Sequence, residues 1–485
     1  MGVIFLLNLF NLLSPDPLHR KIQFWVRQKK NFRTKDRHLL VCHKYLHFGN
    51  LRTAVLNYLF ALQQKGSFLL RLDDTDQERS TEAFAKQIRT DLEWLGFHWE
   101  KEIRQSDRTL RYNEIAERLK SEGRLYPCFE TPDELERRRK RQLASGRPPL
   151  YDRAALKMTQ DERLRFEAEG RVPHWRFRLM NTRDLSSLIP QPTPVEWQDL
   201  IRGTQLVDLS SVSDPVLIRA DGTFLYTFTS VVDDIDFKIT HIIRGEDHVT
   251  NTGVQIDLFR ALGATPPLFA HHALLAGSDD QKMSKRSGDL ALVGQRDLEP
   301  MSVLSYVALI GTSDAIQPLR HMEDLAQRLD LTHVSKSTAH FNLEELRSLN
   351  ARFLHETPYA DVRDRLTQMG VGGGEAFWLA TRGNITVLKN CQDWWKVVTG
   401  PLDPQIEKVS LLEKAQELLP PEPWTDSTWT TWCTALKEVT GVKGRELFHP
   451  LRLALTGQES GPELKLLLPL IGRAKVLARL QGQSA

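Results

Sequence analysis

The chain has 485 residues, enough for about three domains of ordinary size. Its 65 basic and 62 acidic residues give a formal net charge of +3, so the total charge neither indicates nor excludes a nucleic-acid partner, and any binding face must be local. The four cysteines, Cys42, Cys128, Cys391 and Cys433, are widely spaced. This spacing excludes a disulfide scaffold and a Cys-x-x-Cys metal site, and it predicts reduced thiols in a cytoplasmic protein.

The N-terminal segment Met1–Leu13 is apolar but too short to span a bilayer as a helix. In a signal peptide the basic residues precede the apolar run, whereas here they follow it, from Arg20 to Arg37. No later segment is long and apolar enough for a membrane span. We therefore expect neither a signal peptide nor a membrane anchor.

The first clear elements lie between residues 46 and 95. Apolar residues recur there at helical spacing, namely at Leu51, Val55, Leu59 and Leu62. We expect Asn50 to cap this helix and Gly66 to end it. Residues 68–72 then predict a short buried strand, and a second helix follows from about Thr81 to Leu95. A turn, helix, strand and helix in this order predict an α/β nucleotide-binding sheet.

The later segments differ in character. Residues 107–185 are charged and mostly helical, and they include the basic run Arg137–Arg141. Residues 215–219 and 238–244 predict strands, and 255–262 predict a helix. Beyond Glu299 the chain is rich in leucine and mostly helical, with no notable strand pattern.

Two segments carry the chemistry. His47-Phe-Gly-Asn50 opens the first helix, where unpaired backbone amides favour a phosphate, and Gly49 would let a nucleotide approach the backbone. Lys282-Met-Ser-Lys-Arg286 places three cations and a hydroxyl in a Gly-flanked polar loop, which suits a polyphosphate. Either alone is a weak signal, but the pair in this order points to a nucleotide site.

Taken together, these motifs resemble class I aminoacyl-tRNA synthetases, and within them the bacterial-type glutamyl-tRNA synthetases. The resemblance runs from about Tyr45 to the C-terminus. It rests on six stretches: Leu46–Ala54, Leu70–Ser80, Val231–Asp234, Ile243–His248, Lys282–Arg286 and Gly441–Gly457. It implies a Rossmann-like α/β catalytic domain with an α/β acceptor-binding insert, followed by all-α stem-contact and anticodon-binding domains.

The resemblance also implies roles for single residues. His47, Gly49, Asn50, Ser284 and Lys285 would bind ATP. Catalysis would fall to His47, Lys282, Lys285 and Arg286, which stabilise the charge on the leaving pyrophosphate. Glutamate would be held by Arg37, Asp73, Tyr226, Ser230 and Arg244. Asp73 stands where the family more commonly has Glu, and Ser230 where some relatives have Asn.

The same resemblance implies the reaction and its partners. L-glutamate would attack ATP, with Mg²⁺ alongside, to form glutamyl-adenylate, and the glutamyl group would pass to tRNA(Glu); charging of tRNA(Gln) is left open. Some bacterial relatives hold zinc after a Tyr in a Cys-Phe-Cys stretch. This chain has Tyr126-Pro-Cys-Phe-Glu130 with a single cysteine, so we expect no zinc and no other protein-bound metal. We expect a cytoplasmic monomer that does not bind membranes.

The implied domain layout divides the chain into six parts: an unassigned N-terminus (1–38), the two halves of the nucleotide-binding fold (39–106 and 216–298, the latter with the Lys282–Arg286 loop), the acceptor-end-binding insert (107–215), a helical stem-contact region (299–349) and a helical anticodon-binding domain (350–485). Arg137–Arg141 is a candidate phosphate contact within the insert.

The segment before the His47 motif departs from the family. Relatives have an Arg-Phe-Ala-Pro-Ser-Pro-Thr-Gly-like strand and turn where this chain reads Arg37-His-Leu-Leu-Val-Cys-His-Lys44, so only Arg37 coincides. A frameshifted or mis-joined start, which we favour, or a diverged chain with impaired activation would explain this. Under either reading we expect the first strand of the sheet to be missing and adenylate formation to be weak or absent.

Three alternatives remain from the sequence. A glutaminyl-tRNA synthetase would tend to carry a β-barrel anticodon domain, whereas the C-terminal part here reads as helices. A truncated relative that modifies a tRNA base would have no anticodon domain. A non-catalytic tRNA-binding paralogue fits the altered 37–44 segment but not the intact His47 and Lys282–Arg286 motifs.

Overall fold

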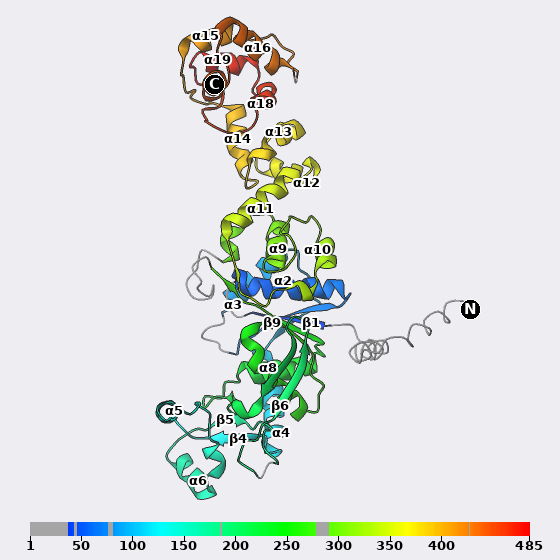
Figure 1. The fold of residues 1–485 in the computed structure, drawn as a ribbon, viewed down its shortest axis with the longest axis vertical. Coiled ribbons are helices and arrows are strands. Elements are labelled where there is room, and N and C mark those ends of the chain that lie inside the picture. Colours follow the sequence, from blue (N-terminus) through cyan, green and yellow to red (C-terminus); the bar gives the residue numbers. More distant parts are fainter. Residues whose placement is uncertain (1–36, 43–45, 76–80, 185–186, 278–290, 426) are drawn as a thin grey trace, which may run out of the picture.

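The computed structural model describes residues 37–42, 46–75, 81–184, 187–277, 291–425 and 427–485. The molecule is elongated, with a large sheet at its middle (Figure 1). Helices of residues 359–480 lie at one end, and α5 (Pro132–Ala144) and α6 (Gln160–Ala168) lie at the other. No helix in the described ranges is both long enough and apolar enough to cross a membrane.

The large sheet has seven strands in the order β3-β2-β1-β9-β10-β6-β7. Neighbouring strands are parallel except β6 and β7, which form an antiparallel hairpin at one edge. The strands are β1 (Arg37–Cys42), β2 (Ser67–Leu72), β3 (Lys101–Arg104), β6 (Pro194–Asp199), β7 (Gly203–Asp208), β9 (His241–Gly245) and β10 (Leu268–His272). Every residue of β2 is buried, as expected for a strand inside a covered parallel sheet.

The strand β1 lies at the centre of this sheet. It pairs with β2 along its whole length, from Arg37 opposite Ser67 to Cys42 opposite Leu72, and with β9 at His38. The expectation that the first strand is missing is therefore wrong. Ladder pairing uses backbone groups, so an extended apolar run such as Leu39-Leu40-Val41 suffices even where the family's residues are absent.

The strand order changes direction between β1 and β9, because β2 and β3 extend to one side of β1, and β9 and β10 extend to the other. In open α/β sheets, ligands bind at such a switch point, outside the carboxyl ends of the strands. Asp199, Arg244 and His271 stand at or next to the ends of β6, β9 and β10, and Asp73 directly follows β2. The fold thus gathers candidate site residues along one edge.

The helix α2 (Phe48–Gln63) follows β1 and packs against the sheet. Leu51, Val55 and Leu59 are fully buried as predicted, whereas Leu62 is exposed. The predicted caps are wrong: His47 caps the helix, and Asn50 sits three residues inside it. At the other end the left-handed residue is Lys65, with φ of 53°, and not Gly66.

The remaining helices between residues 81 and 328 that belong to this part cover the sheet or pack on α2. They are α3 (Glu82–Trp94), α7 (Tyr226–Asp236), α8 (Val249–Ala261), α9 (Pro300–Leu309) and α10 (Met322–Arg328). Thr81 caps α3 through a hydrogen bond to its backbone, so that helix matches its predicted range. α9 and α10 lie on the α2 side of the sheet, and α8 lies on the opposite side (Figure 1).

A second, antiparallel sheet forms the far end of the molecule. Its strands, in spatial order, are β4 (Leu125–Cys128), β5 (His174–Phe177) and β8 (Val216–Ile218). The helix α4 (Thr109–Ser121) precedes β4, and α5 and α6 lie between β4 and β5. α5 buries none of its residues, so the run Arg137–Arg141 is on a solvated helix.

The C-terminal part is helical and has its own core. Its helices are α11 (Leu343–Glu356), α12 (Tyr359–Gln368), α13 (Gly374–Thr381), α14 (Asn390–Thr399), α15 (Val409–Glu417), α16 (Thr428–Thr440), α17 (Arg445–Thr456), α18 (Leu464–Ile471) and α19 (Arg473–Leu480). One apolar cluster contains buried residues from Leu354 to Leu480 only. Trp394 and Trp395 pack against that cluster.

One short strand lies beyond Glu299, where the sequence shows no notable strand pattern. β12 (Ala339–His340) pairs in parallel with β11 (Leu275–Ala276). Two residues are too few to produce a recognisable alternation, so no sequence pattern announces this pair.

Candidate functional site

His47 is the N-cap of α2, and its ring is bonded to the helix that it opens. The Nδ1 atom accepts from the amides of Gly49 at 3.1 Å and Asn50 at 3.3 Å, and the Asn50 side chain accepts from the His47 amide at 2.8 Å. Burial lowers the pKa of His47, so the ring is neutral near pH 7. Since Nδ1 is an acceptor, its proton is on Nε2, and the ring can offer an N–H donor to a ligand.

The structure gives a reason for a glycine at position 49 that the sequence did not reveal. A Cβ at this position would lie 3.0 Å from both Cε1 and Nδ1 of His47. Any other residue would therefore press on the capping ring. The glycine keeps the ring of His47 in place, whether or not it also admits a nucleotide.

The Lys282–Arg286 loop, with Ser284 and Lys285, lies outside the described residues. The chain on its C-terminal side returns directly to His47. Ala291 forms a β-bridge with His47, and the Leu292 amide donates to the Leu46 carbonyl at 2.9 Å. On the other side, β11 packs against α2. Arg37 begins β1, and its role in binding glutamate stays a prediction.

Three of the predicted glutamate-binding residues lie in one connected group. Arg244 donates from Nη1 to the Tyr226 hydroxyl at 3.2 Å and from Nη2 to Gln255 Oε1 at 2.7 Å. Gln255 in turn donates to the Ser230 hydroxyl at 2.9 Å. Tyr226 and Ser230 come from α7, Arg244 from β9 and Gln255 from α8, so three elements converge here.

Arg244 is a buried cation, only 6% exposed, yet none of the described carboxylates forms an ion pair with it. A buried guanidinium without an anion is costly unless a ligand supplies the negative charge. In the described part of the chain the Tyr226 hydroxyl makes one hydrogen bond, as acceptor, which leaves its own proton to donate. Arg244 and Tyr226 together can therefore hold a carboxylate.

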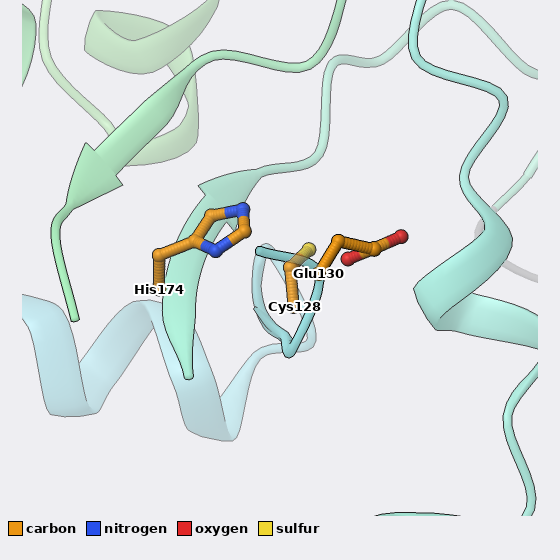
Figure 2. Close-up of side chains that lie close together, drawn as sticks. All are labelled: Cys128, Glu130 and His174. Atoms are coloured by element: carbon orange, nitrogen blue, oxygen red, sulfur yellow. The ribbon is translucent and has the colours of Figure 1, made fainter. Parts of the chain in front are cut away.

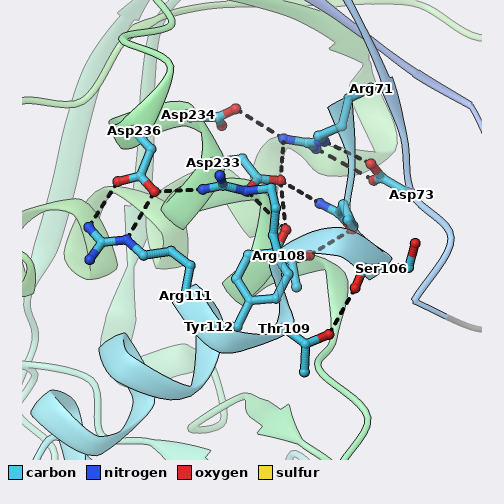
Figure 3. A network of polar contacts seen from close by, with 12 residues as sticks. Arg71, Asp73, Ser106, Arg108, Thr109, Arg111, Tyr112, Asp233, Asp234 and Asp236 are labelled. Carbon is cyan, nitrogen blue, oxygen red and sulfur yellow. Dashed lines mark hydrogen bonds and ion pairs between the residues drawn. The ribbon is translucent and has the colours of Figure 1, made fainter. Parts of the chain in front are cut away.

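Asp73, the fourth predicted residue, belongs to a buried network around Arg71 (Figure 3). Arg71 donates to Asp73 from Nε at 2.7 Å and from Nη2 at 3.5 Å, and its Nη1 pairs with Asp234 at 3.2 Å. Asp233 lies 3.7 Å from the same Nη1. Asp73 is thus held in place by the guanidinium of Arg71.

The neighbouring carboxylates determine the electrostatics of this network. Burial, aided by the charge of Asp233 and opposed by Arg71, raises the pKa of Asp234 to about 7. The charges of Arg244 and Asp73 also act on Asp234, which places the Arg244 group and the Arg71 network side by side. The three carboxylates raise the pKa of Arg71 against the effect of its burial, so it stays charged.

The network reaches into α4. Asp233 accepts from Arg108 Nε at 2.6 Å, from the Tyr112 hydroxyl at 2.9 Å and from Gln105 at 2.8 Å. Arg111 and Arg108 both bond to Asp236 at the end of α7 (Figure 3). The helix that leads into the small sheet is therefore tied to the same buried aspartates as Asp73.

A cluster that the sequence did not predict lies in the small sheet. The ligand atoms of Cys128, Glu130 and His174 all lie within 4.8 Å of one another (Figure 2). The Tyr151 hydroxyl donates to Glu130 Oε1 at 2.7 Å and contacts Cys128 Sγ at 3.7 Å. Burial raises the pKa of Cys128 to about 12, which keeps the thiol protonated, and burial lowers the pKa of His174.

The basic run of α5 borders a groove of about 1040 Å³ between α5 and α6. Arg138 is paired within the protein, with Asp152 at 2.6 Å and Glu130 at 3.6 Å. Arg137, Lys140 and Arg141 are exposed and line the groove, but Glu134, Glu162 and Glu169 line it too. The groove is therefore of mixed charge.

The polar residues that the sequence analysis missed surround Arg244. They are Asp199, Thr252, Gln255 and His271, all buried. Thr252 and Gln255 stand one turn apart on α8, a weak signal because buried helices often carry such pairs. Asp199 and His271 stand at the ends of strands that are 72 residues apart, and no spacing links them.

Comparisons with known proteins agree with the geometry. Residues 43–348 match the family described as class I tRNA synthetases (E and Q), catalytic domain, and residues 403–483 match an anticodon binding domain. A glutamate–tRNA ligase of Methylobacterium radiotolerans is 52% identical over 91% of this chain and 97% of the relative. One from Maricaulis maris is 50% identical over the same shares.

Solved structures give the same result. A glutamate–tRNA ligase from Elizabethkingia meningosepticum, crystallised in complex with its amino acid, superposes with a TM-score of 0.78 at 25% identity and covers 92% of this chain and 99% of that one. A structure from Elizabethkingia anophelis gives a TM-score of 0.77 at the same identity and coverage.

Proposed function

Because the chain belongs to the class I tRNA synthetase family for glutamate and glutamine, we propose that it is a glutamate–tRNA ligase, which activates L-glutamate with ATP and transfers it to the terminal adenosine of tRNA(Glu). The environment of Arg244 is the observation that best supports glutamate as the substrate. It is a buried guanidinium, free of ion pairs with the described carboxylates, and it stands beside the donor hydroxyl of Tyr226. A side-chain carboxylate of the substrate supplies the missing charge, and an amide does not.

We propose that the other end of glutamate is held by Asp73. The Arg71 contacts fix its carboxylate, which would accept from the substrate ammonium. Aspartate is one methylene shorter than the Glu that is more common in the family, so a water or a small shift completes the contact. Ser230 would act through Gln255, since the two share a hydrogen bond.

For activation, the substrate's α-carboxylate attacks the α-phosphate of ATP and pyrophosphate leaves. His47 would donate its Nε2–H to ATP at the start of α2, and Gly49 and Asn50, whose amides donate to His47 Nδ1, would lie beside the nucleotide. Lys282, Ser284, Lys285 and Arg286 would meet the phosphates, since the chain that follows them forms a β-bridge to His47 at Ala291. Mg²⁺ would be held through the phosphates, because the described residues offer no group of three metal-binding side chains beside His47.

For transfer, a ribose hydroxyl at the end of tRNA takes the glutamyl group from the adenylate. No side chain is needed as a nucleophile in either step, so positioning and charge stabilisation carry the catalysis. We propose that residues 39–106 and 216–298 form the nucleotide fold, 107–215 the acceptor-end-binding insert, 299–349 the stem contact and 350–485 the anticodon-binding domain, with 1–38 unassigned.

The small-sheet cluster belongs to this proposal as well. We propose that Cys128, Glu130 and His174 hold no zinc, because the stretch Tyr126–Glu130 has one cysteine where zinc-binding relatives have two. Metal analysis of the purified protein addresses this point. We also propose, from the family resemblance, that the protein is a cytoplasmic monomer.

The experiment is glutamate-dependent ATP–pyrophosphate exchange and charging, measured with tRNA(Glu) and, in parallel, with tRNA(Gln). We expect exchange with glutamate and none with glutamine. The expectation of weak adenylate formation rested partly on a missing strand, and β1 removes that reason. A folded protein that binds tRNA(Glu) but supports no exchange would sink the proposal in favour of a non-catalytic paralogue.

A further inference from the structure

The Arg244 guanidinium is held on the side away from Tyr226 by groups with no assigned role. Its Nε donates to His271 Nε2 at 3.3 Å, and its Nη2 donates to Thr252 Oγ1 at 2.6 Å and to Gln255 Oε1 at 2.7 Å. With the bond to Tyr226, four of its five N–H groups are engaged. One N–H on Nη1 remains for a ligand, next to the Tyr226 hydroxyl.

His271 is itself fixed by a carboxylate. Its Nδ1 donates to Asp199 Oδ2, and its backbone amide donates to Asp199 Oδ1 at 3.1 Å. The amides of Ile201 and Arg202 also donate to Asp199 Oδ1, at 3.1 and 2.9 Å. Both side chains are fully buried.

The protonation states follow from these contacts. Burial lowers the pKa of His271, so the ring is neutral. Burial acts to raise the pKa of Asp199, but the hydrogen bonds from His271 and the backbone outweigh burial. The net pKa is lowered, so Asp199 is an anion. A neutral ring that donates from Nδ1 must present a lone pair on Nε2. That lone pair accepts from Arg244 Nε at 3.3 Å, and the same Nε2 also lies 2.9 Å from the Thr252 hydroxyl.

We propose that Asp199 and His271 are positioning residues that lock the Arg244 guanidinium in the orientation that receives the substrate's side-chain carboxylate. The inference rests on the proposed function, since it concerns the same pocket. Asp199 orients the ring of His271, and His271 takes up the Nε–H of Arg244, so the guanidinium plane cannot turn away from Tyr226. The anion also offsets part of the buried charge while the pocket is empty, without lying close enough to Arg244 to replace the substrate.

A purely packing role would look different. If Asp199 and His271 only filled space, substituting them would affect the affinities for glutamate and for ATP equally. The chain of contacts Asp199–His271–Arg244 instead leads to one end of one substrate. It starts at the end of β6, a strand of the same large sheet that carries Arg244 on β9 and His271 on β10.

The test compares the variants His271→Asn, His271→Gln and Asp199→Asn in charging of tRNA(Glu). Asn at 271 retains a donor toward Asp199 but offers no acceptor at the position of Nε2. We expect it to raise KM for glutamate about tenfold, the effect of losing one hydrogen bond to a charged group, with kcat and KM for ATP within about twofold of the parent. Gln, whose amide oxygen can reach the position of Nε2, should restore part of the affinity.

Asp199→Asn tests the same chain if the His271 variants fold poorly, and we expect the same selective rise in KM for glutamate. His272→Asn is the matched control: it changes the adjacent buried histidine of β10, which contacts Thr53 and the Ala273 carbonyl and not Arg244. It should lower the thermal midpoint and leave KM for glutamate unchanged. Equal rises in KM for glutamate and ATP, or no rise in either folded variant, would overturn the inference. An inactive parent enzyme would instead refute the proposed function.

Discussion

His47 has two separable jobs at the start of α2. Its Nδ1 caps the helix by accepting from two backbone amides. Its proton is therefore on Nε2, which can donate to a ligand. The two nitrogens of one ring therefore serve stability and chemistry respectively. A substitution that keeps an acceptor near Nδ1 but removes Nε2 can separate the two.

His47→Asn should make that separation. Asparagine is among the best N-cap residues, so the free energy of unfolding should change by less than about 0.5 kcal/mol. The phosphate donor is lost, so the rate of ATP–pyrophosphate exchange should fall about 10²- to 10³-fold. His47→Ala should reduce the exchange rate by the same factor and also lower the free energy of unfolding by about 1 kcal/mol. If His47→Asn kept the parental rate, His47 would be a cap alone.

The residues of the proposed glutamate pocket show which single residues can be predicted from a sequence and which cannot. Tyr226 and Arg244 could be placed because they stand within stretches that resemble a known family. Asp199 and His271 could not, since each stands alone at the end of a strand and only the sheet brings them together. The crowding of Gly49 by His47 could not be predicted either, because it depends on a rotamer that no sequence displays.

Among elements, the junction of β2, α7 and α4 has the densest charge. One cation from β2, Arg71, faces Asp73, Asp233 and Asp234, and Arg108, directly before α4, pairs with Asp233. Carboxylates crowded in this way resist full ionisation. The raised pKa of Asp234, at about 7, expresses that crowding.

Asp234 therefore predicts a pH dependence of stability. Its pKa is raised in the folded state, so between about pH 4 and about pH 7 the folded protein binds more protons than the unfolded chain. The stability linked to this group is complete near pH 4 and falls as pH rises to about 7, by up to about 4 kcal/mol. Asp234→Asn should flatten that fall, because an amide does not ionise.

Denaturant unfolding of the parent and of Asp234→Asn at several pH values measures this difference. The carboxylates with lowered pKa values, such as Asp236 and Asp199, are present in both proteins and cancel in the comparison. Parallel stability curves for the two proteins between pH 4 and 7 would show that Asp234 is ionised throughout.

At the level of elements, the sequence predicted those with a strong local pattern. The buried strand of residues 67–72 and the helix capped by Thr81 follow their predicted ranges closely. The first strand was missed because the expectation used family residues, whereas a central strand needs only backbone pairing and an apolar run. The pair β11–β12 was missed because two-residue strands have no period.

At the scale of the whole molecule, the helices beyond Leu354 enclose an apolar cluster of their own, while Leu346 and Leu349 of α11, together with Val387, belong to or pack against the cluster around α2. The buried apolar residues of this cluster all fall between Leu354 and Leu480. We expect a fragment of residues 350–485 to fold alone, because that core is complete within it. Circular dichroism should give a helical spectrum and one cooperative thermal transition. A strand-dominated spectrum, or a featureless one, would contradict the expectation.

The position of β1 between β2 and β9 has a consequence for how the chain folds as it is made. About 200 residues separate Cys42 from His241, which begins the strand that covers the second edge of β1. At bacterial rates of roughly 5 to 20 residues per second, that edge waits about 10 to 40 seconds on the ribosome before its partner emerges. An uncovered parallel strand is a template for other chains. The nascent first half of this protein is thus a natural client for chaperones until β9 is synthesised.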